Sequence, residues 1–285
     1  MNEDSLPTIV ITGCSTGFGR LTAFHLARHG WQVLATVRQE AQRAELLAEA
    51  AAQSLADRLS VIVCDITAPA DVQRLAQAAA ARGPGLDALL NNAGTNYPGP
   101  LERLPLDTLR TQFEINLFAQ LAVTQALLPA IKTARGSVLN VSSTGGSLMV
   151  PLSGAYAMSK SALEAMSEVL RLELAHFGVK VVVIVPGPSP TPIWETGLRR
   201  AHTTPAYADL GEYAAFAAEV ERRARQLAAQ GFPPELFAHT VLRILNSRRP
   251  ATVYYVPRSA ALLIALRRLT PDWLWDLTIR RSLNW

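Results

Sequence analysis

The sequence predicts an α/β fold, in which about seven strands form a doubly wound parallel sheet with helices on both faces. Three observations lead to this prediction. Apolar runs rich in Val, Ile and Leu alternate with helical patterns along most of the chain. A glycine-rich turn directly follows the first of these runs. Polar residues follow several later runs, at the edge of the sheet where ligands of such folds collect.

The strands are predicted from short apolar runs, many of them β-branched, which suit strands buried on both faces. They cover residues 8–11, 32–38, 59–64, 86–90, 136–142, 179–185 and 251–256. Helical patterns separate them: one follows the glycine turn, and the others cover 40–55, 69–81, 106–131 and 153–177. This order gives repeated βαβ units, whose crossovers place parallel strands side by side.

The sequence changes character after Gly187. Pro188, Pro190 and Pro192 cannot lie inside a helix, so we predict a loop to about residue 205 and a helix over 206–230. A helical extension is expected over 258–285. Residues 1–285 are expected to form a single domain, which is an ordinary size for one α/β unit.

The first turn has the spacing Gly13-x-x-x-Gly17-x-Gly19 and includes Ser15, Thr16 and Phe18. Glycines between a strand and a helix let the backbone approach a pyrophosphate, which the helix N-terminus then attracts. By itself, such a turn could equally be a tight loop with no ligand. The strand before it and the helix after it favour a nucleotide site.

Tyr156 and Lys160 lie four residues apart in a predicted helix, so their side chains share one face. An ordinary tyrosine has a pKa of about 10. A nearby cation lowers that pKa and suits the phenol for proton transfer to an alcohol oxygen. Ser143, upstream of this helix, could hold the same oxygen by hydrogen bonding. Taken singly, the Tyr–Lys pair also fits a solvated helix, and Ser143 also fits a turn or a cap.

Further polar residues occur where the same fold would need them. Asp65 and Ile66 follow the third strand, the run Asn91-Asn92-Ala93-Gly94 follows the fourth, Pro186-Gly187 ends the sixth, and Asn116 lies in the long helix. Together with the glycine turn and the Ser–Tyr–Lys set, this order resembles the single-domain branch of the short-chain dehydrogenase/reductase family over residues 8 to about 192. Residues 11–15 and 35–38 look like those of the steroid 17β-dehydrogenase and retinol dehydrogenase group.

The resemblance implies a three-layer Rossmann fold and alcohol–carbonyl chemistry with a nicotinamide cofactor. It implies that Tyr156 is the general acid/base and that Ser143 orients the substrate oxygen. Lys160 would lower the tyrosine pKa and bind the nicotinamide ribose, and Asn116 would hold a water molecule. The implied cofactor-binding residues are Gly13, Ser15, Thr16, Gly17, Phe18, Gly19, Arg38, Asp65, Ile66, Asn92, Ala93, Gly94, Tyr156, Lys160, Pro186, Gly187 and Thr191. Asn91 is expected to be a structural clamp, and Asp65 either meets the adenine or ends its strand as a turn residue.

The second strand carries the signal for the cofactor's phosphate. Relatives that prefer NAD place an acidic residue at its end, where this chain has Val37 followed by Arg38. Arginine is a good partner for a phosphate, so we expect NADP(H) to be preferred, with NAD(H) possible. The alternative is that Arg38 is an exposed arginine at a strand end.

The segment 188–230 is the lid over the substrate in this family, and here it is rich in apolar residues: Ile193, Trp194, Leu198, Tyr207, Leu210, Tyr213 and Phe216. We therefore expect a lipophilic alcohol or carbonyl substrate that is steroid-, retinoid- or lipid-like. The C-terminal extension combines apolar residues with arginines and includes Trp273, Trp275 and Trp285. Such a helix can lie on a membrane surface, although packing against the protein itself or a partner subunit is favoured.

Composition excludes several other classes. The net charge of +4 comes from scattered arginines, which argues against a nucleic-acid partner. Two cysteines indicate a reducing compartment, and we expect a cytoplasmic protein because the acidic residues 1–4 do not read as a secretory signal. No apolar run approaches the roughly 20 residues of a membrane span. The five histidines have no metal-ligand spacing, so no metal is expected.

Two further expectations concern assembly and class. Helices 106–131 and 153–177 have more apolar positions than one sheet-facing stripe requires, which predicts a homodimer or homotetramer. The alternative to an enzyme is a nonenzymatic dinucleotide sensor or interaction protein on the same fold. Such relatives usually lack the Tyr or the Lys that this chain retains.

Overall fold

The computed structural model describes residues 6–204, 207 and 210–283. Its centre is a seven-stranded sheet of order β3-β2-β1-β4-β5-β6-β7, and every neighbouring pair of strands is parallel. The strands are β1 Thr8–Ile11, β2 Gln32–Val37, β3 Leu59–Val63, β4 Ala88–Asn91, β5 Ser137–Val141, β6 Lys180–Pro186 and β7 Val253–Val256. The predicted doubly wound α/β fold is therefore confirmed.

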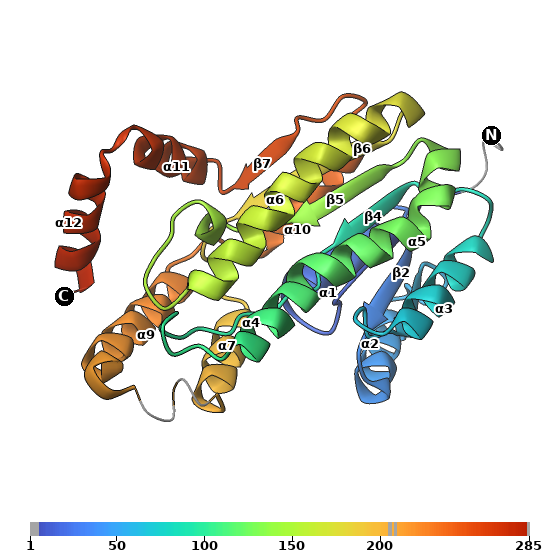
Figure 1. Ribbon diagram of the computed structural model, residues 1–285. Helices are drawn as coiled ribbons and strands as arrows, with labels where there is room; N and C mark the ends of the chain where they lie inside the picture. The colour runs from blue at the N-terminus through green and yellow to red at the C-terminus, as the bar shows by residue number, and fades with distance from the viewer. Residues whose placement is uncertain (1–5, 205–206, 208–209, 284–285) are drawn as a thin grey trace.

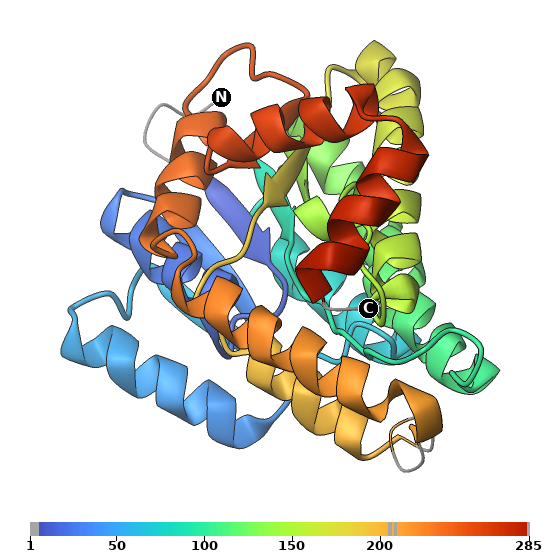
Figure 2. The ribbon, with the colours of Figure 1, turned by 90° about the vertical axis from the view of Figure 1, so that its left-hand side faces the viewer.

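Helices cover both faces of the sheet, which gives the three layers seen in Figures 1 and 2. On one face, α1 Gly17–Arg28, α2 Glu40–Ala52 and α10 Glu235–Leu245 bury residues such as Phe24, Leu46 and Phe237 against β1 and β2. On the other face, α3 Pro69–Ala80, α5 Ala119–Ala134 and α6 Gly154–Leu174 enclose a second core around Val10 and Leu89. The central strands are buried on both sides, as their nearly continuous apolar sequences require.

The predicted helix 106–131 consists of three segments. α4 Leu106–Phe113 runs into one π-helical turn, η1 Glu114–Phe118, and then into α5. The continuous stretch Leu106–Ala134 contains an 18-residue window with a mean hydropathy of 1.2, so among the described residues it is long and apolar enough to cross a membrane by length and composition only. A core helix passes the same test, and Val123, Leu127 and Ile131 pack into the second core.

The lid differs from its prediction. Residues 193–202 were expected to be loop, but they form α7 Ile193–His202, because Pro192, with a φ of −62°, sits at the helix start rather than inside it. From Leu210 on, the predicted helix 206–230 is not continuous: η4 Gly211–Tyr213 leads into α9 Ala214–Ala229. Residues 205–206 and 208–209 lie outside the described part of the chain, as do 1–5 and 284–285, which include Trp285.

Helix α10 had no sequence prediction. The C-terminal extension, in contrast, is helical as expected, with α11 Ser259–Leu269 and α12 Asp272–Leu283. Figure 1 shows α12 beyond the end of the sheet, on the side of α9. Leu283 of α12 packs with Phe216 of α9 and Leu152 in a small separate cluster. The extension therefore borders the lid.

Candidate active site

A cavity of about 500 Å³ opens at the carboxyl ends of the central strands. All but two of the predicted site residues line it: Gly13, Ser15, Thr16, Gly17, Phe18, Arg38, Asp65, Ile66, Asn92, Ala93, Gly94, Ser143, Tyr156, Lys160, Pro186, Gly187 and Thr191. The exceptions are Gly19 and Asn116. Segments far apart in the sequence thus meet at one site, where ligands of doubly wound folds collect.

The glycine turn is packed too tightly for side chains. A Cβ on Gly13, whose φ is +72°, would come within 2.8 Å of the Ala93 Cα atom, and a Cβ on Gly19 would lie 2.4 Å from the Gly13 carbonyl oxygen. The Asn92 amide donates to the carbonyls of Thr12 at 2.8 Å and Gly13 at 3.1 Å. Gly19 therefore shapes the turn from behind rather than lining the cavity.

The N-terminus of α1 faces this cavity without a cap. Thr16, at the N-cap, makes no side-chain hydrogen bond to the helix, and the first turn contains no acidic residue. Free backbone N–H groups at a helix start attract an anion. The chain therefore has a cradle suited to a pyrophosphate, as the sequence predicted.

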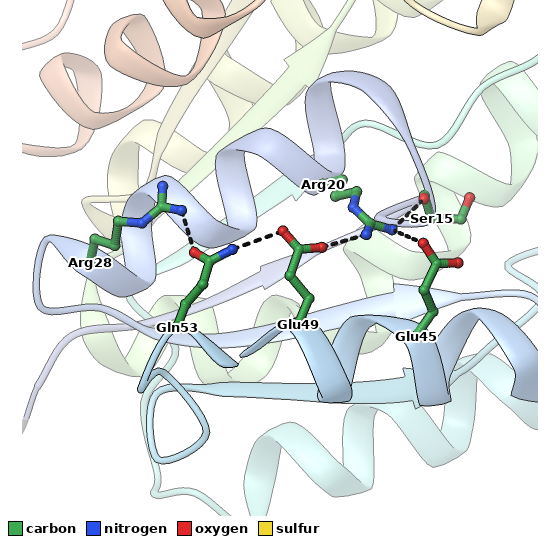
Figure 3. Close-up of polar contacts among 6 residues, drawn as sticks. All are labelled: Ser15, Arg20, Arg28, Glu45, Glu49 and Gln53. Carbon is green, nitrogen blue, oxygen red and sulfur yellow. Dashed lines mark hydrogen bonds and ion pairs between the residues drawn. The ribbon is translucent and has the colours of Figure 1, made fainter. Parts of the chain in front are cut away.

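Arg20 braces the glycine turn from outside, as Figure 3 shows. Its guanidinium donates to the Ser15 carbonyl at 3.3 Å and pairs with Glu45 at 2.9 Å and with Glu49 on α2. The Gln53 amide donates to Glu49 at 2.9 Å and accepts from Arg28 in turn. This chain of polar contacts ties α1 and the turn to α2.

We expect Arg20→Ala to lower the melting temperature by roughly 2–4 °C and to weaken nucleotide binding. The reason is that a partly exposed ion-pair network contributes about 1 kcal/mol, and here it also supports the turn. Calorimetry and nucleotide titration measure the two effects. Arg110→Ala removes an ion pair between more exposed groups, with Asp107, and should change neither. Equal losses in both variants would contradict a role for Arg20 in supporting the turn.

Two asparagines have their amide groups engaged in the protein. The Asn91 amide donates to Thr124 Oγ1 and Asn140 Oδ1, both at 2.8 Å, and thereby joins β4 to α5 and β5. It is a clamp as expected, but within the sheet rather than in the cavity wall. Asn116, in the π turn, donates to the Thr95 carbonyl and to Ser159 Oγ, both at 3.0 Å. Both of its amide protons are used, and its side-chain oxygen accepts from the Thr95 N–H at 2.8 Å.

Ser143, Tyr156 and Lys160 meet beside the end of β5. Ser143 precedes the short helix η2 Thr144–Gly146 and accepts from the Gly145 N–H at 3.1 Å, while its side chain also hydrogen-bonds Tyr156. Lys160 Nζ donates to the Val141 carbonyl at 2.7 Å and lies 5.8 Å from the centre of the Tyr156 ring. One of three ammonium protons is thus committed, and two remain for a ligand.

The pKa of Tyr156 differs from the sequence expectation. Burial raises the pKa of the phenol above its ordinary value, and the hydrogen bond with Ser143 offsets this only in part. The net shift is therefore opposite in direction to the one expected from the charge of Lys160. The pKa of Lys160 itself falls to about 8, because burial disfavours the ammonium more than Glu164 stabilises it. The phenol therefore stays protonated near neutral pH and can donate a proton.

The buried ammonium predicts a pH-dependent stability difference. A folded pKa of about 8 against an ordinary 10.5 means that Lys160 is charged in both folded and unfolded chains below pH 8. Above that pH the folded chain releases the proton first, and wild-type stability rises relative to a variant without the group. We expect Lys160→Met to gain most in melting temperature at pH 6–7 and to lose that gain between about pH 8 and 10.5.

Melting curves of Lys160→Met and wild type across this pH range test the linkage. Lys180→Met is the control, because Lys180 is half-buried at the start of β6 and lies outside the cavity. Its melting temperature relative to wild type should not change in this way with pH. A constant difference between Lys160→Met and wild type at all pH values would contradict the buried-ammonium account.

Asp65 acts as a turn residue at the end of its strand and also lines the cavity. Its carboxylate accepts from the Thr67 N–H at 2.9 Å and from the Thr67 hydroxyl at 2.8 Å. Asp65, which follows β3, also lines the wall of the cavity. Thr191 lies near the glycine turn, where a Cβ on Gly17 would be 3.6 Å from it. Both residues are therefore at positions where a dinucleotide could touch them.

Two arginines of the lid were missed by sequence analysis. Arg199 and Arg200 on α7 line the same cavity as Arg38. Arg200 contacts the Thr95 hydroxyl and lies over the Tyr97 ring, 5.6 Å from its centre. Burial lowers the pKa of Arg200, and the neighbouring charges of Arg38 and Arg199 lower it further. Within the described part of the chain, none of the three pairs with a carboxylate.

Comparison with known families and proteins agrees with this geometry. Residues 7–200 match the family of short chain dehydrogenases. An NADPH-dependent 3-dehydrocapnine reductase of Ornithobacterium rhinotracheale is 32% identical over 96% of this chain and 96% of its own. Mouse estradiol 17-beta-dehydrogenase 2 is 30% identical over 99% of this chain and 77% of its own length.

Other similarities are partial or structural. Human retinol dehydrogenase 16 is 40% identical, but over 63% of this chain and 56% of its own. A short-chain dehydrogenase from Streptomyces avermitilis has a similar structure, with a TM-score of 0.75, 29% identity and coverage of 99% and 98% of the two chains. The steroid and retinol dehydrogenase resemblance seen in the sequence is thereby confirmed.

Proposed function

The chain belongs to the short-chain dehydrogenase/reductase family, and we propose that it is an NADP(H)-dependent enzyme interconverting a lipophilic alcohol with its ketone or aldehyde. Membership in the family makes it an alcohol–carbonyl oxidoreductase. The observation that carries the finer proposal is the meeting of Ser143, Tyr156 and Lys160 with the glycine turn at one cavity. The lid residues Ile193 and Trp194 add an apolar wall to it.

The residues present fit a dinucleotide. Side chains on Gly13 and Gly19 would collide with the backbone of the turn and its neighbour, the start of α1 is uncapped, and the cavity wall has four cationic side chains against the carboxylate of Asp65. Arg38, Arg199 and Arg200 would hold phosphate groups, and Lys160 would bind ribose hydroxyls. The cofactor, when bound, supplies or accepts the hydride.

The proposed mechanism assigns the proton to Tyr156. In the reducing direction its hydroxyl, held by Ser143, gives a proton to the oxygen of the former carbonyl group. Because burial keeps the phenol protonated at neutral pH, the reducing direction needs no prior ionisation. Ser143 fixes the substrate oxygen, and its hydrogen bond with Tyr156 favours the phenolate left behind.

A preference for NADP(H) is proposed from Val37 at the end of β2, where relatives that prefer NAD have an acidic residue, and from Arg38 at the cavity. An acidic residue there would bond the ribose hydroxyls and repel a 2′-phosphate. The full-length similarity to an NADPH-dependent reductase supports this proposal. The retinol and estradiol dehydrogenases among the relatives support a lipophilic substrate.

A cofactor-coupled screen tests the substrate class. Steroid, retinoid, long-chain, sugar and small hydroxy-acid substrates would be offered with NADPH or NADP, with nicotinamide absorbance as the readout. We expect turnover of the lipophilic compounds. Turnover of sugars or small hydroxy acids, with none of the apolar compounds, would overturn the proposed substrate class.

We also propose a homodimer or homotetramer that pairs through α4–α5 and α6. These helices expose large apolar side chains despite their core-facing stripes, including Leu106, Phe118, Val169 and Leu172. Family members pair through the equivalent helices. Light scattering at micromolar protein should give a multiple of the 30.8 kDa chain mass. A monomer mass would contradict this proposal.

A further inference from the structure

A second cavity of about 740 Å³ lies between the loop that follows η2, the lid helix α9 and the C-terminal helices α11 and α12. Most of its wall is apolar, formed by Met149, Pro151, Tyr213, Phe216, Trp275, Ile279 and Leu283. Its volume is within the range of small-molecule sites, which are largely apolar with a few polar groups.

The same wall contains three arginines and one carboxylate, that of Asp276. Arg267 is engaged, because it donates to Asp272 at 2.8 Å and to the Thr270 carbonyl at 3.2 Å. Arg268 and Arg280 form no ion pair within residues 6–204, 207 and 210–283. The wall thus combines a large apolar surface with two exposed guanidiniums that form no ion pair in the described part of the chain.

This second cavity lies one short helix, η2, away from the reaction centre. Ser143 at the start of η2 lines the first cavity, and Ser147 at its end lines the second. One 3₁₀ turn rises about 2 Å per residue, so the two serines are separated by roughly 8 Å along the chain. Arg268 also acts electrostatically on Glu164, whose carboxylate accepts from the Ser142 hydroxyl at 2.6 Å. A single extended molecule is long enough to occupy both places.

We infer that the second cavity takes the far end of the substrate, and that this end is an apolar chain bearing an anionic group such as a carboxylate, sulfonate or phosphate. A neutral steroid or retinoid would bury apolar surface there but would make no charge-assisted contact with Arg268 or Arg280. An anionic amphiphile would pack its chain against the apolar residues and place its charged group against Arg268 and Arg280. Hydrogen bonds between a guanidinium and an anion are charge-assisted and therefore strong. The inference rests on the proposed function, whose reaction centre it shares.

The test compares a medium-chain oxo fatty acid, with its ketone near the methyl end, against its methyl ester. For wild type with NADPH, we expect kcat/KM to be roughly tenfold or more higher for the acid, since one charge-assisted contact is lost in the ester. The double variant Arg268→Gln/Arg280→Gln should lose this preference through KM. Arg281→Gln is the matched control, because Arg281 is an exposed neighbour that does not line the cavity.

A binding measurement separates failure of this inference from failure of the proposed function. Displacement of a dansyl-labelled fatty acid by laurate or by dodecanol needs no turnover. We expect laurate to displace it better than dodecanol in wild type and in Arg281→Gln, but not in the double variant.

Each result then decides one claim. If wild type reduces ketones but treats acid and ester alike, the anionic-substrate inference is overturned and the oxidoreductase proposal stands. If no ketone is reduced while laurate binding still depends on Arg268 and Arg280, the proposed function is wrong and the ligand class of the cavity stands. If the labelled fatty acid does not bind wild type, the inference is overturned.

Discussion

Tyr156→Phe should reduce kcat by about 10³-fold while leaving NADPH binding nearly unchanged. The phenol hydroxyl lines the cavity and can pass a proton to the substrate oxygen, because burial keeps it protonated at neutral pH. General acid catalysis of this kind contributes roughly 10²–10⁴-fold, and 10³-fold corresponds to about 4 kcal/mol of barrier. Steady-state kinetics and a fluorescence titration with NADPH measure the two quantities.

Tyr255→Phe is the matched control for this substitution. Tyr255 is a half-buried tyrosine on β7 that packs near Val183 and Ile264 and does not line the cavity. Loss of the Tyr255 hydroxyl should leave kcat within a factor of about two of the wild-type value. If Tyr156→Phe retained more than a tenth of the wild-type kcat, the assignment of Tyr156 as the general acid/base would be contradicted.

Arg38→Ala should lower kcat/KM with NADPH by roughly 10–100-fold and leave kcat/KM with NADH almost unchanged. A guanidinium–phosphate pair is a strong, often bidentate contact, and only NADPH has the 2′-phosphate. Arg200→Ala should have a smaller effect in the same direction. Arg200 lies close enough to Arg38 for the charge of Arg38 to lower the pKa of Arg200.

Arg43→Ala is the control for nonspecific loss of positive charge near β2. Arg43 pairs with Glu40 on α2 and does not line the cavity. It should preserve the ratio of kcat/KM values for the two cofactors. Equal kcat/KM for NADPH and NADH in wild type, or an unchanged ratio in Arg38→Ala, would contradict the proposed NADP(H) preference.

The sequence was sufficient for the central fold because its strands are unambiguous. Runs such as residues 181–185 are β-branched and apolar throughout, and they can be stable only when buried on both faces of a parallel sheet. The glycine turn was equally readable, since the backbone crowding at Gly13 and Gly19 tolerates no other residue without displacement. The strand pattern and the glycine spacing can both be seen in short stretches of sequence, although the crowding itself involves Asn92 and Ala93.

The lid was predicted poorly because its structure depends on tertiary contacts. Three prolines in 188–192 indicated a long loop, yet the last of them begins α7, and this helix places Arg199 and Arg200 at the cavity. Helix α10 was not predicted at all, although Phe237, Val241 and Ile244 become part of the main core. No local signal relates the lid arginines to Arg38, more than 150 residues earlier.

The electrostatics of Tyr156 and Lys160 could not be obtained from their spacing. Four residues of separation in a helix indicated a cation that lowers the tyrosine pKa. Burial instead raises the pKa of the tyrosine and lowers that of the lysine to about 8. Desolvation by burial is the largest cause of both shifts. The degree of burial is a property of the packed fold and not of the motif.

Transfer of a deuterium label tests the central claim most directly. Wild type and Tyr156→Phe would be incubated with a lipophilic ketone and NADPH deuterated at the transferred position, and the alcohol analysed by mass spectrometry. The account predicts that wild type forms alcohol with one deuterium on the former carbonyl carbon, and that Tyr156→Phe forms almost none. No alcohol from wild type across the ketone panel, or equal labelled product from both proteins, would contradict it.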